Sequence, residues 1–273
     1  MYLENDVKLT NTLVISDGTV YLCLNGKTLT IDKAGYPAVS IGANQKFVLC
    51  DCIGTGKITG AKGSAENDPA RFGAVNCKSG SNFAMYGGTT VIGNTSSVNG
   101  SANNLYLNNG RMFQFRKGLT GTEKVGVSVP GTPTLAKPIN IEWVFDAVWH
   151  DTEGDRSNLI IPDNDSYTVI YNSNVKMHQL IPKPLLTLTA DKISVSNLNK
   201  PAVLFVASYD GNGLLDIKKI EIGADTEKTV TETALNTANA VKISAFLWDN
   251  SDGKWDVNMY PLCNGAQTNL KDL

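Results

Sequence analysis

The apolar positions of the N-terminal half follow one pattern, which occurs four times between Thr12 and Gly121. Each copy has an apolar pair spaced by two residues, a second such pair, a glycine turn and a third apolar position before a small residue. The first pairs are Leu13/Ile15, Val39/Ile41, Val75/Cys77 and Leu105/Leu107. The second pairs are Val20/Leu22, Phe47/Leu49, Phe83/Met85 and Phe113/Phe115. The third positions are Leu29, Ile58, Ile92 and Leu119.

This spacing is the period of a β-strand and not that of a helix. The copies differ in length, and the differences fall in two insertions, residues 60–73 and 94–103. Stacking of such copies buries like residues against like, which predicts a right-handed parallel β-helix. A β-sandwich is the alternative, but it gives no reason for similar residues to recur at the same phase. Two inward ladders are expected: Ile15, Ile41, Cys77 and Leu107 in one, and Val20, Phe47, Phe83 and Phe113 in the other.

The repeat ends after residues 129–133 (VPGTP). Residues 140–151 then have apolar positions at helical spacing, with Asn140 as a plausible N-cap, so we expect a short helix that caps or flanks the β-helix. Residues 167–171 predict one further strand, interpreted as a last degenerate coil. Pro182 and Pro184 mark a hinge. The predicted domains are therefore residues 1–182 and 183–273.

The second domain shows longer strands with turn signals between them. Asp210-Gly-Asn-Gly213 predicts a hairpin turn. About 90 residues of this kind predict an immunoglobulin-like β-sandwich. The expected strands are residues 192–195, 202–209, 214–222, 228–233, 241–248 and 257–262.

Charge and hydropathy limit the classes of function. The chain of 273 residues has 24 basic and 26 acidic residues, so it lacks the basic excess typical of nucleic-acid-binding proteins. No apolar run reaches the length of about 18 residues that spans a membrane. Met1 is followed by no basic and apolar leader, so we expect either a cytoplasmic protein or a mature or trimmed chain.

Several segments resemble the β-helix repeats of cell-surface proteins from clostridia-like Gram-positive bacteria. They are residues 2–10 (YLENDVKLT), 22–29 (LCLNGKTL), 48–52 (VLCDC), 54–60 (GTGKITG) and 83–94 (FAMYGGTTVIGN). The similarity covers roughly the first 130 residues. Residues 202–215 and 242–249, with 260–263, resemble a C-terminal accessory module of the same secreted proteins. The resemblance implies a secreted or wall-associated protein with structural or adhesive roles, and it favours a mature or trimmed chain.

The chain has five cysteines, which are candidates for metal binding and for disulfides. Cys50-Asp-Cys52 lacks the second ligand pair that a zinc site needs, so no metal site is predicted. Cys77 falls on an inward position and is interpreted as a small buried hydrophobe. Cys23 and Cys50 hold equivalent positions in successive copies, close enough for a disulfide, although stacked free thiols are favoured.

Parallel β-helices often carry polysaccharide lyases and hydrolases, whose sites need neighbouring carboxylates. The outward positions of the predicted coils carry none. They are Val14, Ser40, Asn76 and Tyr106 beside the first strands, and Tyr21, Val48, Ala84 and Gln114 beside the second. We therefore predict no catalytic residue, no cofactor and no metal.

Acidic loops, histidines and tryptophans offer weaker candidates. Residues 151–155, beside His150, and residues 210–216 and 249–256 have some character of calcium loops, but solvated turns are the default for such composition. His150 and His178 suggest no nucleophile partnership. Four tryptophans could form a sugar platform, with Trp255 expected to be the most exposed: Trp143, Trp149, Trp248 and Trp255.

Two hypotheses follow. The first is a non-enzymatic extracellular or surface protein with a structural, adhesive or self-assembling role, which associates through the ends of the β-helix or binds a glycan or a cell-surface ligand. The second is a carbohydrate-active or carbohydrate-binding β-helix protein. Any function is expected in the two insertions, in the ends of the stack or in the second domain.

Overall fold

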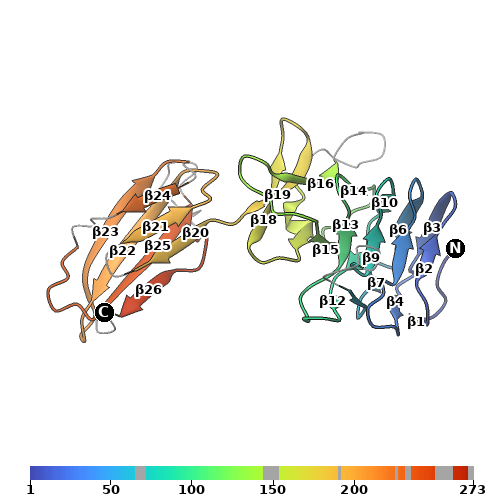
Figure 1. The fold of residues 1–273 in the computed structure, drawn as a ribbon, viewed down its shortest axis with the longest axis horizontal. Coiled ribbons are helices and arrows are strands. Elements are labelled where there is room, and N and C mark those ends of the chain that lie inside the picture. The colour runs from blue at the N-terminus through green and yellow to red at the C-terminus, as the bar shows by residue number, and fades with distance from the viewer. Residues whose placement is uncertain are drawn as a thin grey trace. The chain divides into compact units, whose positions relative to one another are not determined.

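The computed structural model describes residues 1–64, 72–143, 154–189, 192–224, 227–230, 235–249 and 261–269. The chain forms two compact units, Met1–Ile181 and Pro182–Leu273 (Figure 1). Apart from the short 3-10 helix η2 (Ser157–Leu159), the regular elements of the described residues are all strands. Within these residues, no helix has the length and apolar character needed to cross a membrane.

Most strands of the first unit pair in parallel with the equivalent strand of the next copy (Figure 1). The first ladder contains β2 (Leu13–Ile15), β5 (Val39–Ile41), β9 (Val75–Cys77) and β13 (Leu105–Leu107). The second contains β3 (Thr19–Cys23), β6 (Lys46–Cys50), β10 (Asn82–Met85), β14 (Phe113–Phe115) and β16 (Ile139–Trp143). The third contains β1 (Val7–Leu9), β4 (Thr28–Ile31), β7 (Lys57–Ile58), β11 (Thr90–Val91), β15 (Lys124–Ser128) and β17 (Ile160–Pro162).

Strand β15 connects two ladders, because its first part pairs with β11 and its last part with β13. Two further short strands, β8 (Lys62–Gly63) and β12 (Thr95–Ser96), pair in parallel within the insertions. The long parallel sheets are compatible with the predicted β-helix.

The predicted inward ladders are confirmed by the register. Ile41 pairs with Ile15 and with Cys77, and Cys77 pairs with Leu107. In the second ladder Phe47, Phe83 and Phe113 are register partners, and the rings of Phe47 and Phe83 stack with centroids 5.9 Å apart. These side chains are almost fully buried, and burial of each is worth roughly 1.5–3 kcal/mol. The core of the unit is thus built by repetition of one contact along the stack.

The third ladder differs from the sequence prediction at two positions. Ile58 pairs with Val91, and β11 continues to β15 through Val91 and Val125. Ile92 and Leu119 are only half-buried, so their assignment to this ladder was wrong. The turn between the second apolar pair and the third strand differs in length from copy to copy. The distance from that pair therefore does not tell which residue of the third strand faces the core.

The predicted helix at residues 140–151 is wrong at its start, because residues 139–143 form strand β16, which pairs in parallel with β14. Residues 144–151 lie outside the described residues. Ile139, Ile141 and Trp143 also satisfy the period of two, and the strand buries Ile141 completely. A short apolar segment fits both periods, and here pairing with the existing sheet decides between them.

The second ladder ends in an antiparallel strand. β19 (Met177–Pro182) pairs with β16 in antiparallel orientation, and β18 (Tyr167–Asn172) lies beside β19. The predicted strand at residues 167–171 is confirmed, but it extends this mixed sheet instead of forming another parallel coil.

The second unit has two antiparallel sheets. One contains β20 (Leu185–Leu188), β21 (Ile193–Ser196) and β24 (Glu227–Val230). The other has the order β23 (Leu214–Ile222), β22 (Ala202–Tyr209), β25 (Lys242–Asp249) and β26 (Ala266–Asn269). Side chains of both sheets share one hydrophobic core, among them Leu186, Val195, Leu204 and Leu247.

Four of the six strands predicted for this unit match β21, β22, β23 and β25 within one residue at each end. A fifth prediction, residues 228–233, overlaps β24, and its last three residues lie outside the described part. Of the predicted strand 257–262, residues 257–260 also lie outside it. β20 and β26 were not predicted. The hairpin turn is confirmed: the backbone N–H of Asp210 donates to the Gly213 carbonyl over 2.9 Å.

Candidate functional site

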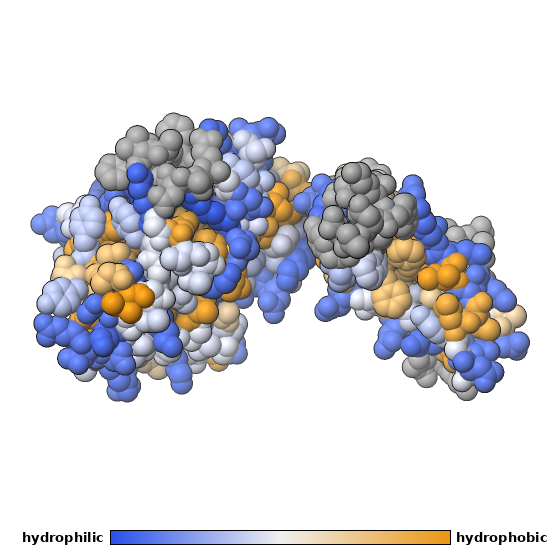
Figure 2. Space-filling view, turned by 180° about the vertical axis from the view of Figure 1, so that it is seen from behind, coloured by the Kyte–Doolittle hydropathy of each residue, from blue (hydrophilic) through white to orange (hydrophobic). Residues whose placement is uncertain are grey.

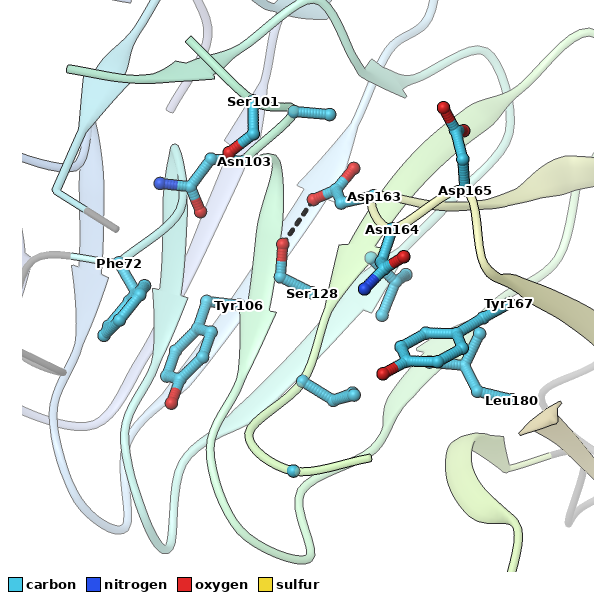
Figure 3. Close-up of a pocket in the computed structure, with 14 residues that line it drawn as sticks. Phe72, Ser101, Asn103, Tyr106, Ser128, Asp163, Asn164, Asp165, Tyr167 and Leu180 are labelled. Carbon is cyan, nitrogen blue, oxygen red and sulfur yellow. Dashed lines mark hydrogen bonds between the residues drawn. The ribbon is translucent and has the colours of Figure 1, made fainter. Parts of the chain in front are cut away.

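A pocket of about 390 Å³ opens on the outer face of the first unit, beside β13 and β15 (Figure 3). This volume is within the usual range of small-molecule sites. Aromatic and polar side chains from separate parts of the chain line it, including Phe72, Tyr106, Ser128, Asp163, Asn164 and Tyr167.

One wall of the pocket is aromatic. Tyr106 is an outward residue of β13, and Phe72 stacks on it with ring centroids 4.6 Å apart and planes inclined by 19°. Burial raises the pKa of the Tyr106 hydroxyl. Tyr167, the first residue of β18, lies on the opposite side of the pocket (Figure 3). Two tyrosine rings therefore flank the polar groups between them.

Asn103 positions the aromatic wall. Its Nδ2 donates to the Ser64 carbonyl over 2.9 Å, and its Oδ1 accepts from the Gly73 backbone N–H over 2.8 Å. Ser64 and Phe72 form an isolated parallel bridge. One buried amide thus joins both ends of the insertion at residues 60–73 and holds Phe72 beside Tyr106.

Asp163 is the carboxylate at the base of the polar wall. Its Oδ2 accepts from the Ser128 hydroxyl over 2.5 Å and from the Asn104 backbone N–H over 2.7 Å. Its Oδ1 accepts from Asn104 Nδ2 over 2.6 Å. Burial raises the pKa of Asp163, against the opposing effect of these donors. Figure 3 shows the hydrogen bond from Ser128.

The buried side-chain amides of Asn94 and Asn104 form a hydrogen-bond network that holds Asp163. Asn104 Oδ1 accepts from both the backbone N–H and the Nδ2 of Asn94, over 3.1 and 2.9 Å. Asn94 Nδ2 also donates to the Ile58 carbonyl over 3.0 Å, and its Oδ1 accepts from the Ala61 backbone N–H. Asn94, Asn104 and Asp163 therefore connect three successive turns of the stack, and the carboxylate is a structural member of this network.

Asn164 and Asp165 supply more accessible polar groups. Both are exposed, and Figure 3 shows the Asn164 side chain directed toward the tyrosine rings, whereas that of Asp165 points away from the Tyr167 ring. Asn164 Oδ1 accepts from the Ser166 backbone N–H over 2.9 Å, which fixes the side chain in a short turn. The Nδ2 group is thereby presented to the pocket.

The predicted outward ladder is confirmed in register, but it continues one step further than the sequence pattern showed. Val14, Ser40, Asn76 and Tyr106 are successive partners, and Tyr106 pairs with Ser128, whose hydroxyl contacts Asp163. Beyond the four copies this face carries Asp163, an acidic residue that the sequence prediction did not include. Ser40 and Asn76, expected to be wet, are buried.

Sequence reasoning missed Asp163 because the fifth copy is interrupted. The one available signal is the apolar segment Ile160–Pro162, which precedes Asp163 and pairs with β15.

His178 lies in a second polar cluster, at the end of the first unit. Its Nδ1 is 2.7 Å from Oε2 of Glu142, and its Nε2 accepts from the Arg156 backbone N–H over 2.8 Å. Both ring nitrogens are therefore occupied, and the side chains of Glu142 and His178 are fully buried. This arrangement fixes the end of the stack and offers no nucleophile. His150 lies outside the described residues.

The acidic loops that are described use their carboxylates to hold turns. Asp210 Oδ1 accepts from the backbone N–H groups of Asn212 and Gly213, and Asp155 Oδ1 from that of Ser157. Residues 151–153 and 250–256 lie outside the described residues, as do Trp149 and Trp255. Trp143 is 37% exposed and Trp248 is half-buried. Neither of these two tryptophans lines the pocket.

The cysteines are all free thiols. Cys77 is buried, as predicted, and burial raises its pKa to about 12. Cys23 and Cys50 are register partners, and Cys52, which the pattern did not connect with Cys23, has its Sγ 3.4 Å from the Cys23 Sγ. Cys23, Asp51 and Cys52 are the one group of three possible metal ligands within the part of the chain that the structure describes.

Comparison of the sequence with known protein families and with curated proteins gave no match.

Proposed function

We propose that this chain is a non-enzymatic, extracellular adhesive protein whose first unit, a right-handed parallel β-helix, binds a glycan in the pocket between Tyr106 and Tyr167. The second unit serves as an immunoglobulin-like accessory module. The observation that carries the proposal is the pocket itself, which combines aromatic rings with a directed amide on a rigid stack.

The chemistry of the pocket suits a sugar. Aromatic rings offer apolar faces to the C–H groups of a pyranose, while a tyrosine hydroxyl keeps a polar end. Asn164 adds amide donors and Asp165 adds carboxylate acceptors at the rim. Because β13 and β15 are paired strands of the sheet, Tyr106 and Ser128 are held without loop rearrangement.

A polysaccharide hydrolase or lyase is the second candidate, and the observation that favours it is the carboxyl group of Asp163 in the lining of the pocket, because such enzymes use carboxyl groups as acids and bases. Two observations weigh against that role. The Asp163 oxygens already accept three hydrogen bonds, from Ser128 and twice from Asn104. The neighbouring Asp165 side chain points away from the Tyr167 ring, so its carboxylate does not face a sugar held against that ring (Figure 3).

The surface and the N-terminal end of the stack bear on the interaction role. Figure 2 shows hydrophobic residues set among hydrophilic ones on both units. At the N-terminal end of the stack, β2 is the edge strand of its sheet, and Val14 on it is 56% exposed. The free edge of β3 is instead covered by Met1 and Leu3, which form backbone hydrogen bonds with Cys23. Exposed edge strands are suited to pairing with another chain, which supports self-association as a further part of the proposal. Sedimentation of the full chain over a range of concentrations tests it, and a monomer at every concentration would remove it.

The function is tested with the full chain on an array of plant and host glycans, with and without calcium. Each glycan is also incubated with the protein, and the products are analysed by mass spectrometry. The proposal predicts saturable binding and no new reducing ends or unsaturated products. Product formation would establish the enzymatic alternative, and the absence of both binding and products would leave a structural role.

A further inference from the structure

Cys23 and Cys52 come from the first two coils and meet on the outer face of the second ladder. Their Sγ atoms are 3.4 Å apart, although 28 residues separate them in the chain. Cys52 is exposed, while Cys23 is half-buried. A groove of about 440 Å³ runs beside both sulfurs and is lined also by Tyr21, Tyr86 and Lys117.

The backbone around the two thiols is held by Asp51. Its Oδ1 accepts from the Gly26 backbone N–H over 2.6 Å, and its Oδ2 accepts from those of Gly54 and Gly56 over 2.8 and 2.6 Å. Gly56 leaves room for this carboxylate, since a Cβ there would lie 2.8 Å from it. The turn that carries Cys52 is therefore tied to the turn that follows Cys23.

The same contacts argue against a metal ion at this site. Both Asp51 oxygens are occupied by backbone donors, so the carboxylate is not available as a ligand. Cys50 donates its thiol to the Leu22 carbonyl, with Sγ and oxygen 3.5 Å apart. Two sulfurs alone do not complete the four-ligand shell of a structural zinc site.

The thiols also differ in acidity. Burial opposes ionisation of Cys23, but hydrogen bonds from the backbone N–H groups of Cys52 and Asn25 and from the neighbouring thiols outweigh it and lower its pKa. Burial and the neighbouring cysteines raise the pKa of Cys50 to about 11. The thiolate form is the nucleophile in disulfide exchange.

We propose that Cys23 and Cys52 form a thiol–disulfide exchange site, which reacts with low-molecular-weight disulfides and closes to a bridge between the first two coils. This inference does not depend on glycan binding.

The reaction has two exchange steps. The Cys23 thiolate attacks one sulfur of the incoming disulfide RSSR, forming a Cys23–SR mixed disulfide and releasing RS⁻, which takes up the proton that Cys23 lost. Cys52 then loses its proton, and its thiolate attacks the Cys23 Sγ, forming the Cys23–Cys52 bond and releasing the second RS⁻, which is protonated. Two protein thiols are oxidised, and one RSSR is reduced to two RSH.

The test uses the full chain, reduced, freed of reductant, incubated with glutathione disulfide and then alkylated. Trypsin separates Cys23, in residues 9–27, from Cys50 and Cys52, in residues 47–57. Non-reducing mass spectrometry should show these two peptides cross-linked. Cys50→Ser is the matched control and should cross-link at a rate within about twofold of the parent chain, whereas Cys52→Ser should stop at a glutathione adduct on Cys23.

Three results would overturn the proposal. One is a cross-link that survives in Cys52→Ser and disappears in Cys50→Ser, which would assign the bridge to the register partners. Another is glutathione adducts without any cross-link in the parent chain. The third is protection of all three thiols from alkylation by stoichiometric zinc, which would make the cluster a metal site. Circular dichroism of each variant checks that the fold is retained. Cys52→Ser should disturb the fold least, because Cys52 is exposed.

Discussion

Phe72 stacks on Tyr106 with ring centroids 4.6 Å apart, although the two residues belong to successive copies of the repeat. Phe72 lies near the end of the insertion at residues 60–73, and Tyr106 occupies an outward position of β13. The aromatic wall of the pocket is therefore made by two copies together, one that contributes Phe72 from its insertion and one that contributes Tyr106. In the first unit the repeated buried residues specify the parallel sheets, and an inserted segment contributes a wall of the pocket.

The stability of the first unit should depend strongly on its phenylalanine ladder. Phe83 lies between its register partners Phe47 and Phe113 and is 1% exposed. Phe83→Ala leaves a cavity between coils and should lower the unfolding free energy by about 3–5 kcal/mol. Urea titration of the full chain measures the loss and identifies the transition of this unit. An unchanged transition would mean that the ladder does not carry the core.

Asp163 should be a structural residue. Asp163→Asn leaves one carbonyl oxygen for three donors and places an amide N–H₂ against one of them, so a loss of about 1–3 kcal/mol is expected. The measurement is again the urea transition of the first unit. Asp165→Asn, at the exposed neighbouring position, is the control and should change stability by less than about 0.5 kcal/mol. Equal stability of the two variants would contradict the structural role.

Glu123 should make the first unit sensitive to acid. Burial opposes ionisation of this carboxyl, but donors from the backbone N–H of Gly88 and from the backbone and hydroxyl of Thr120 outweigh it and lower its pKa below 4.5. A depressed pKa in the folded state contributes stability above the unfolded value and loses it as pH falls through the folded value. The contribution is therefore complete at neutral pH and declines below about pH 4.5.

The variant Glu123→Gln should lose about 1–3 kcal/mol at pH 7. Its amide N–H₂ takes the place of Oε2, which accepts from the Gly121 backbone N–H over 2.8 Å, and the donors at Oε1 then bind a neutral oxygen in place of a charged one. Its stability should then fall less steeply than that of the parent chain below about pH 4.5. Urea titrations at a series of pH values measure both effects, and exposed Glu4→Gln serves as the control. Parallel pH curves for the parent chain and Glu123→Gln would refute the assignment.

The sequence was sufficient to predict much of the parallel core, because burial imposes the same period on every copy. Ile15, Ile41, Cys77 and Leu107 could be aligned before their pairing was known. Prediction failed where the chain departs from the repeat. In the third ladder the inward residue is Val91 and not the predicted Ile92, because the apolar pattern does not specify the length of the preceding turn. The start of the predicted helix is strand β16, because so short an apolar segment fits the helical period as well as the strand period.

The candidate site was harder to predict than the core. Tyr106 was identified as outward, but its partners Phe72 and Asp163 come from an insertion and from an interrupted fifth copy. Their meeting depends on hydrogen bonds such as those of Asn103 and Asn104, which leave no periodic signal in the sequence. The contact between Cys23 and Cys52 was missed for a related reason, because only Cys50 holds the equivalent repeat position.

The most direct test of the account is calorimetric titration of the first glycan that the array identifies, into the parent chain and four variants. Tyr106→Ala removes part of the aromatic wall, and Asn164→Ala removes an exposed amide with little risk to the fold. Tyr21→Ala and Asn174→Ala, at exposed positions that do not line the pocket, are the matched controls. Tyr106→Ala should weaken binding about fivefold or more, since a central aromatic contact contributes more than about 1 kcal/mol. Asn164→Ala should weaken it about two- to tenfold, since a hydrogen bond contributes about 0.5–1.5 kcal/mol, while the controls bind like the parent chain. Unchanged affinity in both pocket variants would contradict glycan binding at this site.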